Sequence, residues 1–339
     1  MAKCRVCDGA GRLLHHICPL CDGVIGWPEH EPCDSMSFDL RATVDRGSVL
    51  PEGLSVLSWN VFNPDTIGLA TMENRHYNHL LPEERFWEHR FPKIMQEIRA
   101  ADAAVVCLQE INIRHYAEIK EAMAALGYNA FTHKKMQRNS LAIFFKQKFL
   151  QVWEKHVKVK GFEKSLAIGL RDGSHTLAVV TCHLEGHPEK ASDRVAQLEK
   201  TFTEIEKLPH NALVIAGDFN APLVEDGWKN SAVTAYMCSG EVPTGTTEWG
   251  YAISLPATLT PHGHVLASAY APTAASSICL HGEGPALIDH IWFSSSLNLV
   301  GVRNVFFDKA FQADVFARGL PNLRNPSDHL PLGAVFHWT

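Results

Sequence analysis

Short apolar runs recur from about Leu54 to the end of the chain, and this recurrence constrains the fold more than any other feature. The runs with the length and residue types of β-strands are LSVLSW, AAVVCLQ, SLAIFF, HTLAVVTCHL, NALVIAG, LIDHIWFS and LPLGAVFHW. Several are too apolar to face water on either side, so the sheets that they form must be covered on both faces. The chain is therefore predicted to be α/β, with packed sheets inside and helices outside.

Helical periodicity occupies two of the gaps between these runs. Over residues 188–208 apolar side chains recur every three or four positions, and Pro188 stands where a helix can begin. Residues 85–100 show the same spacing, and Pro92 is expected to break or restart that helix. The loop-rich stretch 239–284 is a candidate rim for a site.

The size and composition are those of a globular protein with a substantial core: 339 residues, of which 46% are hydrophobic and 20% are charged. The apolar runs are all shorter than the roughly 18 residues of a membrane span. The first residues, MAKCRVCDGAGR, lack the apolar core of a signal peptide. We therefore expect an intracellular protein, cytoplasmic or nuclear, without a membrane span.

The charge is unevenly distributed. A formal net charge of −6 argues against a protein that coats nucleic acid non-specifically, because such binding depends on many contacts from Lys and Arg to phosphate. Between His133 and Lys164, however, nine Lys and Arg residues stand against two Glu residues. This stretch fits either a flank for a phosphate-bearing substrate or the solvated outer faces of strands and turns.

Polar residues follow or interrupt the ends of six apolar runs. They are Asn60, Glu110, His183, Glu185, Asp218, Asn220, Asp289, His290, Asp328 and His329. One such residue has a structural explanation, since it can simply cap a strand. Strands that share a sheet bring their ends together, so acids, amides and imidazoles at so many ends indicate a common site.

This set of groups suits the metal-assisted attack of water on a phosphate ester. Carboxylates are hard ligands for Mg²⁺ or Mn²⁺, and Glu110 is the first choice for that role. Asp218 with Asn220 suits the orientation or deprotonation of the attacking water. An imidazole paired with a carboxylate would stabilise the charge that develops on the phosphate.

The order of motifs over roughly residues 54–339 resembles the endonuclease/exonuclease/phosphatase superfamily with the DNase I-like fold. The motifs are SWNV, CLQE, SLAIFFK, TCHLE, GDFN, IDHIWFS and SDHLPL, and GDFN followed by a terminal SDH is the specific combination. SLAIFFKQKF, LASAY and IDHIWFS look most like the nocturnin and deadenylase branch. The segment APTAASSICLHGEGP lacks the Thr-Asn pair that precedes the Asp in that branch, which argues against a poly(A) substrate.

The resemblance implies a four-layered α/β sandwich, with two packed β-sheets flanked by helices, and a Mg²⁺-dependent phosphodiesterase. Carried over by position, it implies metal ligands at Asn60, Glu110 and Asp328, catalytic roles for His183 on the scissile phosphate, Asp218 and Asn220 at the water, and Asp289 orienting His329. Gln109 and Arg194 are either phosphate contacts or structural residues.

The N-terminal cysteines form two C-x-x-C pairs, Cys4 with Cys7 and Cys18 with Cys21. Four thiolates at this spacing predict a structural zinc site, with a redox-active pair as the weaker reading. The pairs resemble half of the CxxCxGxG zinc-binding region of DnaJ-type chaperones, which implies a small module for protein or nucleic-acid contact. The expected organisation is a zinc module at 1–34, a join at 35–53 and a catalytic domain at 54–339, and SFDLRATVDRG within the join is either a docked strand or a linker.

Other histidines are not expected to bind zinc. His183 and His187 have helical i, i+4 spacing, but they follow a strand-like run and precede Pro188, which argues against a helical zinc site. His290 is next to Asp289 on a strand, so it should point away from the site if Asp289 points in.

Three functions remain in competition at this level. The leading prediction is a nuclease acting on RNA or DNA. The first alternative is a phosphatase or lipid phosphodiesterase of the inositol phosphate or sphingomyelin type, because the fold and core motifs do not separate these substrates. A basic, aromatic-lined groove near residues 133–164 would favour nucleic acid. The second alternative is a catalytically inactive, zinc-bearing adaptor.

Overall fold

The computed structural model describes residues 12–13, 16–17, 42–44, 53–66, 77, 80–160, 162–225, 229–255, 259–270, 286–306 and 309–339. The four cysteines predicted to bind zinc, Cys4, Cys7, Cys18 and Cys21, lie outside these residues. Among the residues described, no helix has both the length and the apolarity needed to cross a membrane.

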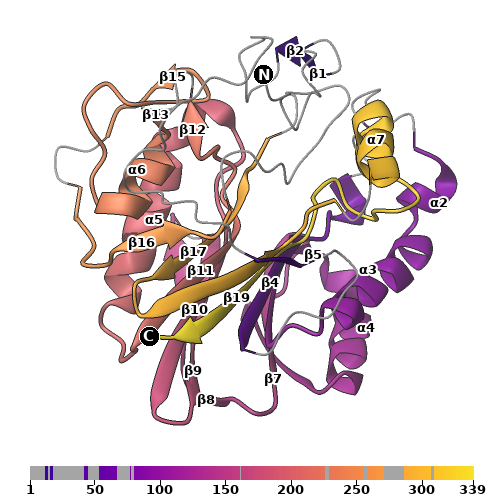
Figure 1. Ribbon diagram of the computed structural model, residues 1–339, viewed down its shortest axis with the longest axis horizontal. Helices are drawn as coiled ribbons and strands as arrows, with labels where there is room; N and C mark the ends of the chain where they lie inside the picture. Colours follow the sequence, from indigo (N-terminus) through magenta and orange to yellow (C-terminus); the bar gives the residue numbers. More distant parts are fainter. Residues whose placement is uncertain are drawn as a thin grey trace.

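Two mixed β-sheets form the centre of the protein (Figure 1). The six-stranded sheet has the order β16 (Leu266–Ser268), β17 (Asp289–Ser294), β11 (Ala212–Asp218), β10 (His175–His183), β9 (Phe162–Asp172) and β8 (Leu150–Val159). The seven-stranded sheet has the order β3 (Ala42–Val44), β18 (Leu297–Arg303), β19 (Leu332–Trp338), β4 (Leu54–Asn60), β5 (Val105–Ile111), β7 (Ser140–Lys146) and β6 (Tyr128–Thr132). Most neighbours are antiparallel, but β10–β11, β4–β5 and β18–β3 are parallel.

Helices lie on both sides of the paired sheets, which is the layered arrangement predicted from the sequence. On the side of β4 and β5 are α2 (Pro82–Arg85), α3 (Trp87–Ala101), α4 (Ile113–Ala125) and α7 (Lys309–Arg318) (Figure 1). On the side of β10 and β11 are α5 (Ala191–Ile205), which follows a short 3₁₀ helix (Pro188–Lys190), and α6 (Ala232–Ser239). Short strand pairs join β12 (Val224–Glu225) to β13 (Lys229–Asn230) and β14 (Thr247–Glu248) to β15 (Tyr251–Ala252).

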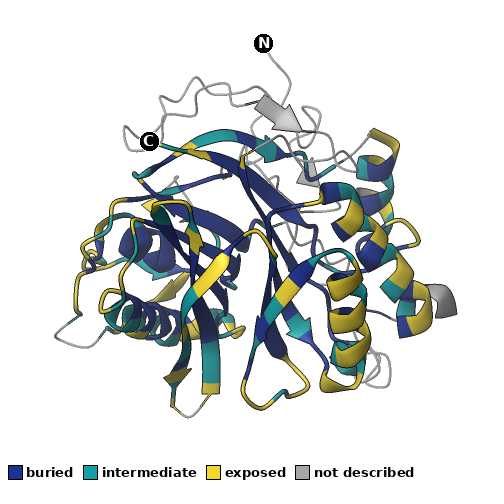
Figure 2. Ribbon diagram, turned by 90° about the horizontal axis from the view of Figure 1, so that it is seen from below, coloured by how far each residue is buried: buried dark blue, intermediate teal, exposed yellow. Residues whose placement is uncertain are grey.

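The alternation of side chains along each strand explains why the layers hold together. Val56 and Cys107 belong to the core between the sheets, whereas Leu57 and Leu108 pack in a second cluster with Ile98 of α3. Neighbouring residues on one strand thus serve two cores, as strands buried on both faces must. The central strands are accordingly buried, and the exposed residues of the helices face outward (Figure 2).

Helix α3 corrects one prediction, because it runs without a break through Pro92. The helix begins only five residues earlier, so proline deprives it of a single backbone hydrogen bond near its start. Pro92 is also exposed, on the side of the helix that faces away from the apolar core.

Residues 42–44, within the segment predicted to be either a docked strand or a linker, form strand β3. They pair in parallel with β18, from Ala42 opposite Gly301 to Val44 opposite Arg303. This part of the join therefore extends the seven-stranded sheet.

Candidate active site

Strand register places three of the predicted residues in one row across the six-stranded sheet. His183 at the end of β10 is the register partner of Asp218 on β11, and Asp218 is the partner of Asp289 on β17. Side chains of register partners lie on the same face of a sheet. The row therefore presents an imidazole and two carboxylates to the space between the sheet ends.

Gly217 explains why a glycine precedes the acid in the GDFN motif. A Cβ atom at this position would lie 2.1 Å from the carbonyl oxygen of Cys182 on the neighbouring strand. Any side chain would push β10 and β11 apart and disturb the row of His183 and Asp218.

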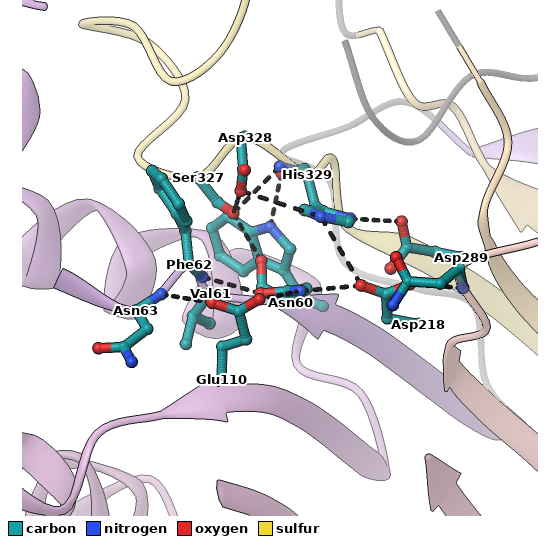
Figure 3. Close-up of polar contacts among 12 residues, drawn as sticks. Asn60, Val61, Phe62, Asn63, Glu110, Asp218, Asp289, Ser327, Asp328 and His329 are labelled. Atoms are coloured by element: carbon teal, nitrogen blue, oxygen red, sulfur yellow. Dashed lines mark hydrogen bonds and ion pairs between the residues drawn. The ribbon is translucent and has the colours of Figure 1, made fainter. Parts of the chain in front are cut away.

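The carboxylate of Asp218 is held by two hydrogen bonds from separate parts of the chain. The backbone N–H of Asn220 donates to Oδ1 at 2.9 Å. Nδ2 of Asn60 donates to Oδ2 at 3.0 Å (Figure 3). Asn220 has a positive φ of 49°, which asparagine tolerates better than most residues, and its Nδ2 donates to the carbonyl of Leu184 at 3.2 Å. The two-residue spacing of Asp218 and Asn220 thus makes a turn that fixes the acid.

Asn60 lies between two carboxylates. Besides its bond to Asp218, its Nδ2 donates to Oε1 of Glu110 at 3.1 Å, while its Oδ1 accepts from the N–H of Phe62 at 3.0 Å. Asn60 thus presents its nitrogen to the acids and holds them together. Its role as a metal ligand stays a prediction.

Glu110 reaches this space because strand β5 is irregular at its end. The pairing of β5 with β7 shifts register between Leu108 and Ile111, and Glu110 has a φ of 60°, uncommon for a residue other than glycine. Its Oε2 accepts from the N–H of Asn63 at 2.8 Å, and its side chain stays 15% exposed. A backbone held in this conformation places the carboxylate beside Asn60 and Asn63, where both of its oxygens accept hydrogen bonds.

His329 and Asp289 form a buried pair, with His329 Nδ1 2.7 Å from Asp289 Oδ2 (Figure 3). Burial alone would lower the pKa of His329, but Asp289, Asp328 and Asp218 together raise it well above its ordinary value. The three carboxylates therefore favour the protonated imidazole. Its Nε2 lies 3.8 Å from Oδ2 of Asp218, so a cationic donor stands beside the acid.

His183 completes the group from the other side. Its Nε2 lies 3.7 Å from Oδ2 of Asp218 and 3.9 Å from Oε1 of Glu110, and its side chain is 21% exposed. This imidazole can contact an anion that enters between the two acids.

The set of donors fits a divalent cation. The hydroxyl of Tyr77 donates to Oδ2 of Asp328 at 2.7 Å. Burial raises the pKa of Asp328 to about 6; His329 opposes the rise and Glu110 adds to it. The carboxylates of Asp328 and Glu110 are hard oxygen ligands of the kind that Mg²⁺ or Mn²⁺ requires, and such a cation would offset the repulsion between them.

A second arrangement of metal ligands is geometrically possible but chemically weaker. One ligand atom from each of Asp218, Asp289 and His329 lies within 4.8 Å of the others. Asp289 Oδ2, however, is already hydrogen-bonded to His329 Nδ1, and the surrounding carboxylates favour the protonated form of His329, which is not a metal ligand. We read this trio as an ion pair beside an acid.

Arg90 supports the site, and the sequence offered no sign of it. Its guanidinium is buried and donates to the carbonyls of Val61, Phe62 and Pro326 at 2.6, 2.8 and 2.5 Å. It thereby joins the turn after β4 to the loop that carries Asp328. Arg90 is 236 residues away from Pro326 in the chain, so no local pattern could reveal the contact.

Ser327 and Trp59 fix the same loop. Ser327 donates its hydroxyl to the carbonyl of Asn60 at 2.6 Å, and Trp59 donates its indole N–H to the carbonyl of His329 at 2.8 Å. The serine of the SDH motif was visible in the sequence, but its partner was not.

Two further candidates are structural rather than phosphate contacts. Arg194 is fully buried, pairs with Glu248 at 2.6 Å and donates to the carbonyls of Glu185, His187 and Pro188. Gln109 is buried between the sheets, where its Nε2 donates to Thr181 at 3.0 Å.

The remaining histidines behave as the strand pattern predicts. His290 points away from the site and contacts the carbonyl of Ala221 at 2.8 Å, and burial lowers its pKa to about 4. His183 ends β10 and His187 precedes the 3₁₀ helix, so the two do not share a helix.

Comparison with known proteins places this site in a family. Residues 57–329 match the model of the Endonuclease/Exonuclease/phosphatase family. The chain belongs to this family. The architecture of two packed mixed sheets flanked by helices is its DNase I-like α/β fold.

Similar proteins within the family come from several lineages. The chain is 24% identical to protein angel homolog 2 of Danio rerio, over 86% of this chain and 65% of that protein. It is also 24% identical to the CCR4-Not complex 3′-5′-exoribonuclease subunit Ccr4 of Schizosaccharomyces pombe, over 74% of this chain and 45% of that protein. The chain thus spans less than two thirds of either relative.

The fold is shared with a solved structure, that of ANGEL2, a 2′,3′-cyclic phosphatase, in complex with adenosine-2′,3′-vanadate. The two superpose with a TM-score of 0.71 at 22% identity, over 88% of this chain and 99% of the other.

Proposed function

We propose that this chain is a divalent-metal-dependent phosphoric ester hydrolase, and specifically a nuclease that hydrolyses phosphodiester bonds of RNA or DNA. The observation that carries the proposal is the position of Asp218. It is linked to Glu110 through the side chain of Asn60 on one side, and it lies 3.8 Å from the imidazole of the His329–Asp289 pair on the other. An acid, an imidazolium and a cluster of oxygen ligands are the groups that hydrolysis of a phosphodiester by water requires.

Each group has a distinct task in this proposal. Glu110 and Asp328, with Asn60 through its Oδ1, would hold Mg²⁺ or Mn²⁺, which would supply Lewis-acid polarisation of a phosphoryl oxygen. Asp218, held by Asn220, orients the attacking water and accepts its proton.

The two histidines act on the phosphate. His329 donates through Nε2 to a phosphoryl oxygen as charge develops on it, and Asp289 keeps the imidazole oriented and protonated. His183 contacts the scissile phosphate from the side of Glu110.

The relatives favour RNA among the polymers. One is an exoribonuclease subunit, and the similar structure is a 2′,3′-cyclic phosphatase. A cyclic phosphodiester at the end of an RNA is a second candidate substrate for the same groups.

Hydrolysis by the purified protein tests the proposal. The panel contains oligo(A), mixed RNA, single-stranded, double-stranded and abasic DNA, adenosine 2′,3′-cyclic phosphate and inositol phosphates, each with Mg²⁺, Mn²⁺ or EDTA. We expect cleavage of RNA that EDTA abolishes.

The matched controls are two substitutions of Asp by Asn. Asp218→Asn should abolish turnover, whereas Asp102→Asn should not. Asp102 caps the C-terminus of α3, at the end of β5 opposite to Glu110, and its side chain is 55% exposed, so it lies away from the site. Metal-independent cleavage, or equal rates for Asp218→Asn and wild type, would refute the assignment. Cleavage of inositol phosphates alone would select the phosphatase alternative, and no turnover of any substrate would select the inactive adaptor.

For the N-terminal segment we propose a structural zinc site at Cys4, Cys7, Cys18 and Cys21, in a module at 1–34 that is joined by 35–53 to the catalytic domain at 54–339. Strands β1 (Arg12–Leu13) and β2 (His16–Ile17) lie between the two cysteine pairs and form an antiparallel hairpin. A hairpin turns the chain back on itself, as a four-thiolate site needs. Such a module suits contact with protein or nucleic acid inside the cell.

Zinc analysis tests this second proposal. Cys4→Ser combined with Cys21→Ser should remove one bound zinc while turnover of a small substrate persists. Unchanged zinc content would contradict the zinc site, and loss of turnover in a folded protein would assign the module a part in catalysis.

A further inference from the structure

A basic cavity of about 490 Å³ adjoins the reaction centre at His183. Its lining residues are His133, Lys134, Lys135, Gln137, Asn139, Leu141, Lys158, Phe162, Glu163, Lys164 and His183. The volume falls within the roughly 300–1,000 Å³ range of small-ligand sites, which accommodates a nucleotide. The proposed catalytic roles use only His183 from this set.

The strand register explains why the cavity borders the site. Ser165 on β9 is the partner of Cys182 on β10, so Lys164 and His183 are the next residues at the same sheet end. Ser140 at the start of β7 is the partner of Ile111, so the turn 133–139 lies at the end of β5 that carries Glu110.

A hydrogen-bonded chain also connects the cavity wall to the acids. Asn139 accepts a hydrogen bond from Nδ2 of Asn63, and the N–H of Asn63 donates to Glu110 at 2.8 Å. His183 lines the cavity and also lies beside Glu110 and Asp218, so the cavity and the reaction centre share a residue and adjoin each other.

The cavity is cationic although the chain is acidic. Four lysines line it against one carboxylate, in a chain with a formal net charge of −6. Within the part of the chain that the structure describes, Lys134, Lys135 and Lys164 have no carboxylate at ion-pair distance. Unpaired ammonium groups crowded in this way favour an anionic ligand.

Two lysines outside the cavity provide the contrast. Lys155 and Lys160 also lie on or next to β8, but they pair with Glu204 at 2.5 Å and with Asp193 at 2.7 Å. The lysines of the outer face are thus neutralised within the protein, and those of the cavity are not.

The one acid of the cavity orients a lysine. Oε1 of Glu163 lies 3.6 Å from Nζ of Lys158, and its Oε2 lies 3.5 Å from Nδ1 of His156. The side chain of Glu163 is only 11% exposed. It therefore orients Lys158 through the ion pair and presents little negative charge to an anionic ligand at the surface.

An aromatic side chain stands at the outer wall. Phe162, the first residue of β9, lines the cavity and is 64% exposed, so its ring is accessible to a ligand there. A base removed from a stack can lie on such a ring, and this contact tolerates any base.

We propose that this cavity binds the nucleotides that adjoin the scissile phosphate in a single-stranded nucleic acid. Lys134, Lys135 and Lys164 contact the phosphates, and a base stacks on Phe162. The inference rests on the proposed function and specifies its substrate as an unpaired strand, because a base within a duplex is not free to stack on protein. An exposed ring distinguishes this ligand from a compact polyphosphate, which would need the lysines only.

Binding is measured by fluorescence anisotropy in the Asp218→Asn background, so that the strand stays intact. The probe is a fluorescein-labelled RNA decanucleotide titrated at several salt concentrations. Phe162→Ala should weaken binding by on the order of 10-fold, and Phe162→Trp should restore it. Replacing Lys134, Lys135 and Lys164 with Ala should reduce the slope of log affinity against log salt by about 0.7 for each phosphate that the protein no longer neutralises.

The matched control combines Lys155→Ala with Lys160→Ala, which removes two lysines of the same hairpin. This control should bind as tightly as the Asp218→Asn parent. Thermal unfolding followed by circular dichroism checks that every variant is folded.

The outcomes separate this inference from the proposed function. If the wild type cleaves the strand but the cavity variants bind it like the control, the cavity assignment fails and the proposed function stands. If the wild type cleaves no strand and the Asp218→Asn protein binds none, both fail. If inositol hexakisphosphate binds through the three lysines without Phe162 and the strand does not displace it, the cavity is a polyphosphate site and the strand assignment is wrong.

Discussion

The reaction centre and the basic cavity beside it are built at the same sheet ends but are held in different ways. At the centre, His183 and Asp218 are fixed by strand register, and Asp218 is 1% exposed. In the cavity, Lys134 and Lys135 stand on an exposed turn, and Phe162 projects from the start of a strand. The difference teaches that the chemistry depends on the strands, whereas the choice of substrate depends on turns that can change without disturbing a sheet.

The sharpest test of this comparison is at His329. His329→Gln keeps a donor for Asp289 but removes the imidazolium, so turnover should fall by roughly 10²–10⁴-fold. The measurement is kcat on the substrate that the hydrolysis panel identifies, with exposed His337→Gln as the control. A His329→Gln protein within tenfold of wild type would remove His329 from the mechanism.

A smaller loss of turnover is expected on substitution of Arg90, which contacts none of the predicted catalytic groups. Arg90→Met leaves three carbonyls without their donor and should lower the free energy of unfolding by about 3 kcal/mol. It should also reduce turnover by up to about 10²-fold, because the loop of Asp328 would shift. Arg99→Met, on the exposed face of the same helix, is the control for chemical denaturation and kcat. Loss of stability with unchanged kcat would show that the loop holds its position without Arg90.

Gly217 tests the strand register directly. Gly217→Ala should lower the free energy of unfolding by about 1–3 kcal/mol, because the added methyl group meets the carbonyl of Cys182. The matched variant is Gly263→Ala, where the added Cβ meets nothing within 4 Å. Equal urea midpoints for the two variants would mean that β10 and β11 can separate freely. The reaction centre would then not be held by strand register, and its contrast with the cavity would be lost.

The smallest effect concerns the floor of the cavity. Burial lowers the pKa of His133 to about 4, although Glu163 raises it and His156 lowers it further. In the unfolded chain this histidine takes up a proton near pH 6.5, whereas in the folded protein it stays neutral down to about pH 4. The free energy of unfolding therefore falls as the pH drops from about 6.5 to 4. His133→Asn should remove on the order of 1 kcal/mol of this fall. Urea unfolding across that range measures it, with His337→Asn as the control, and identical pH profiles for wild type and His133→Asn would contradict the prediction.

The strands and their polar ends could be predicted from the sequence because both depend on local pattern. The apolar runs that end at Asn60 and Asp218 are strands β4 and β11, and residues at strand ends meet for reasons of sheet geometry alone. The alternation also placed His290 on the face opposite Asp289.

What the sequence could not predict depends on contacts between distant residues. Arg90 and Ser327 reach partners more than two hundred positions away, and nothing near either residue marks the contact. Strands β8 and β9 were not predicted for a different reason. Much of 150–164 is charged, and such a stretch lacks the apolar pattern by which the other strands were recognised.

The row formed by His183, Asp218 and Asp289 also limits how a chain of this kind can be altered. Loss of one residue inside β11 would turn Asp218 to the opposite face of the sheet, and Asn60 and His329 would be left without it. Insertions in the turn 133–139 or between β8 and β9 change neither register. These turns are therefore the places where segments from other proteins could be grafted to redirect this protein to a new substrate while its bond-breaking groups stay in place.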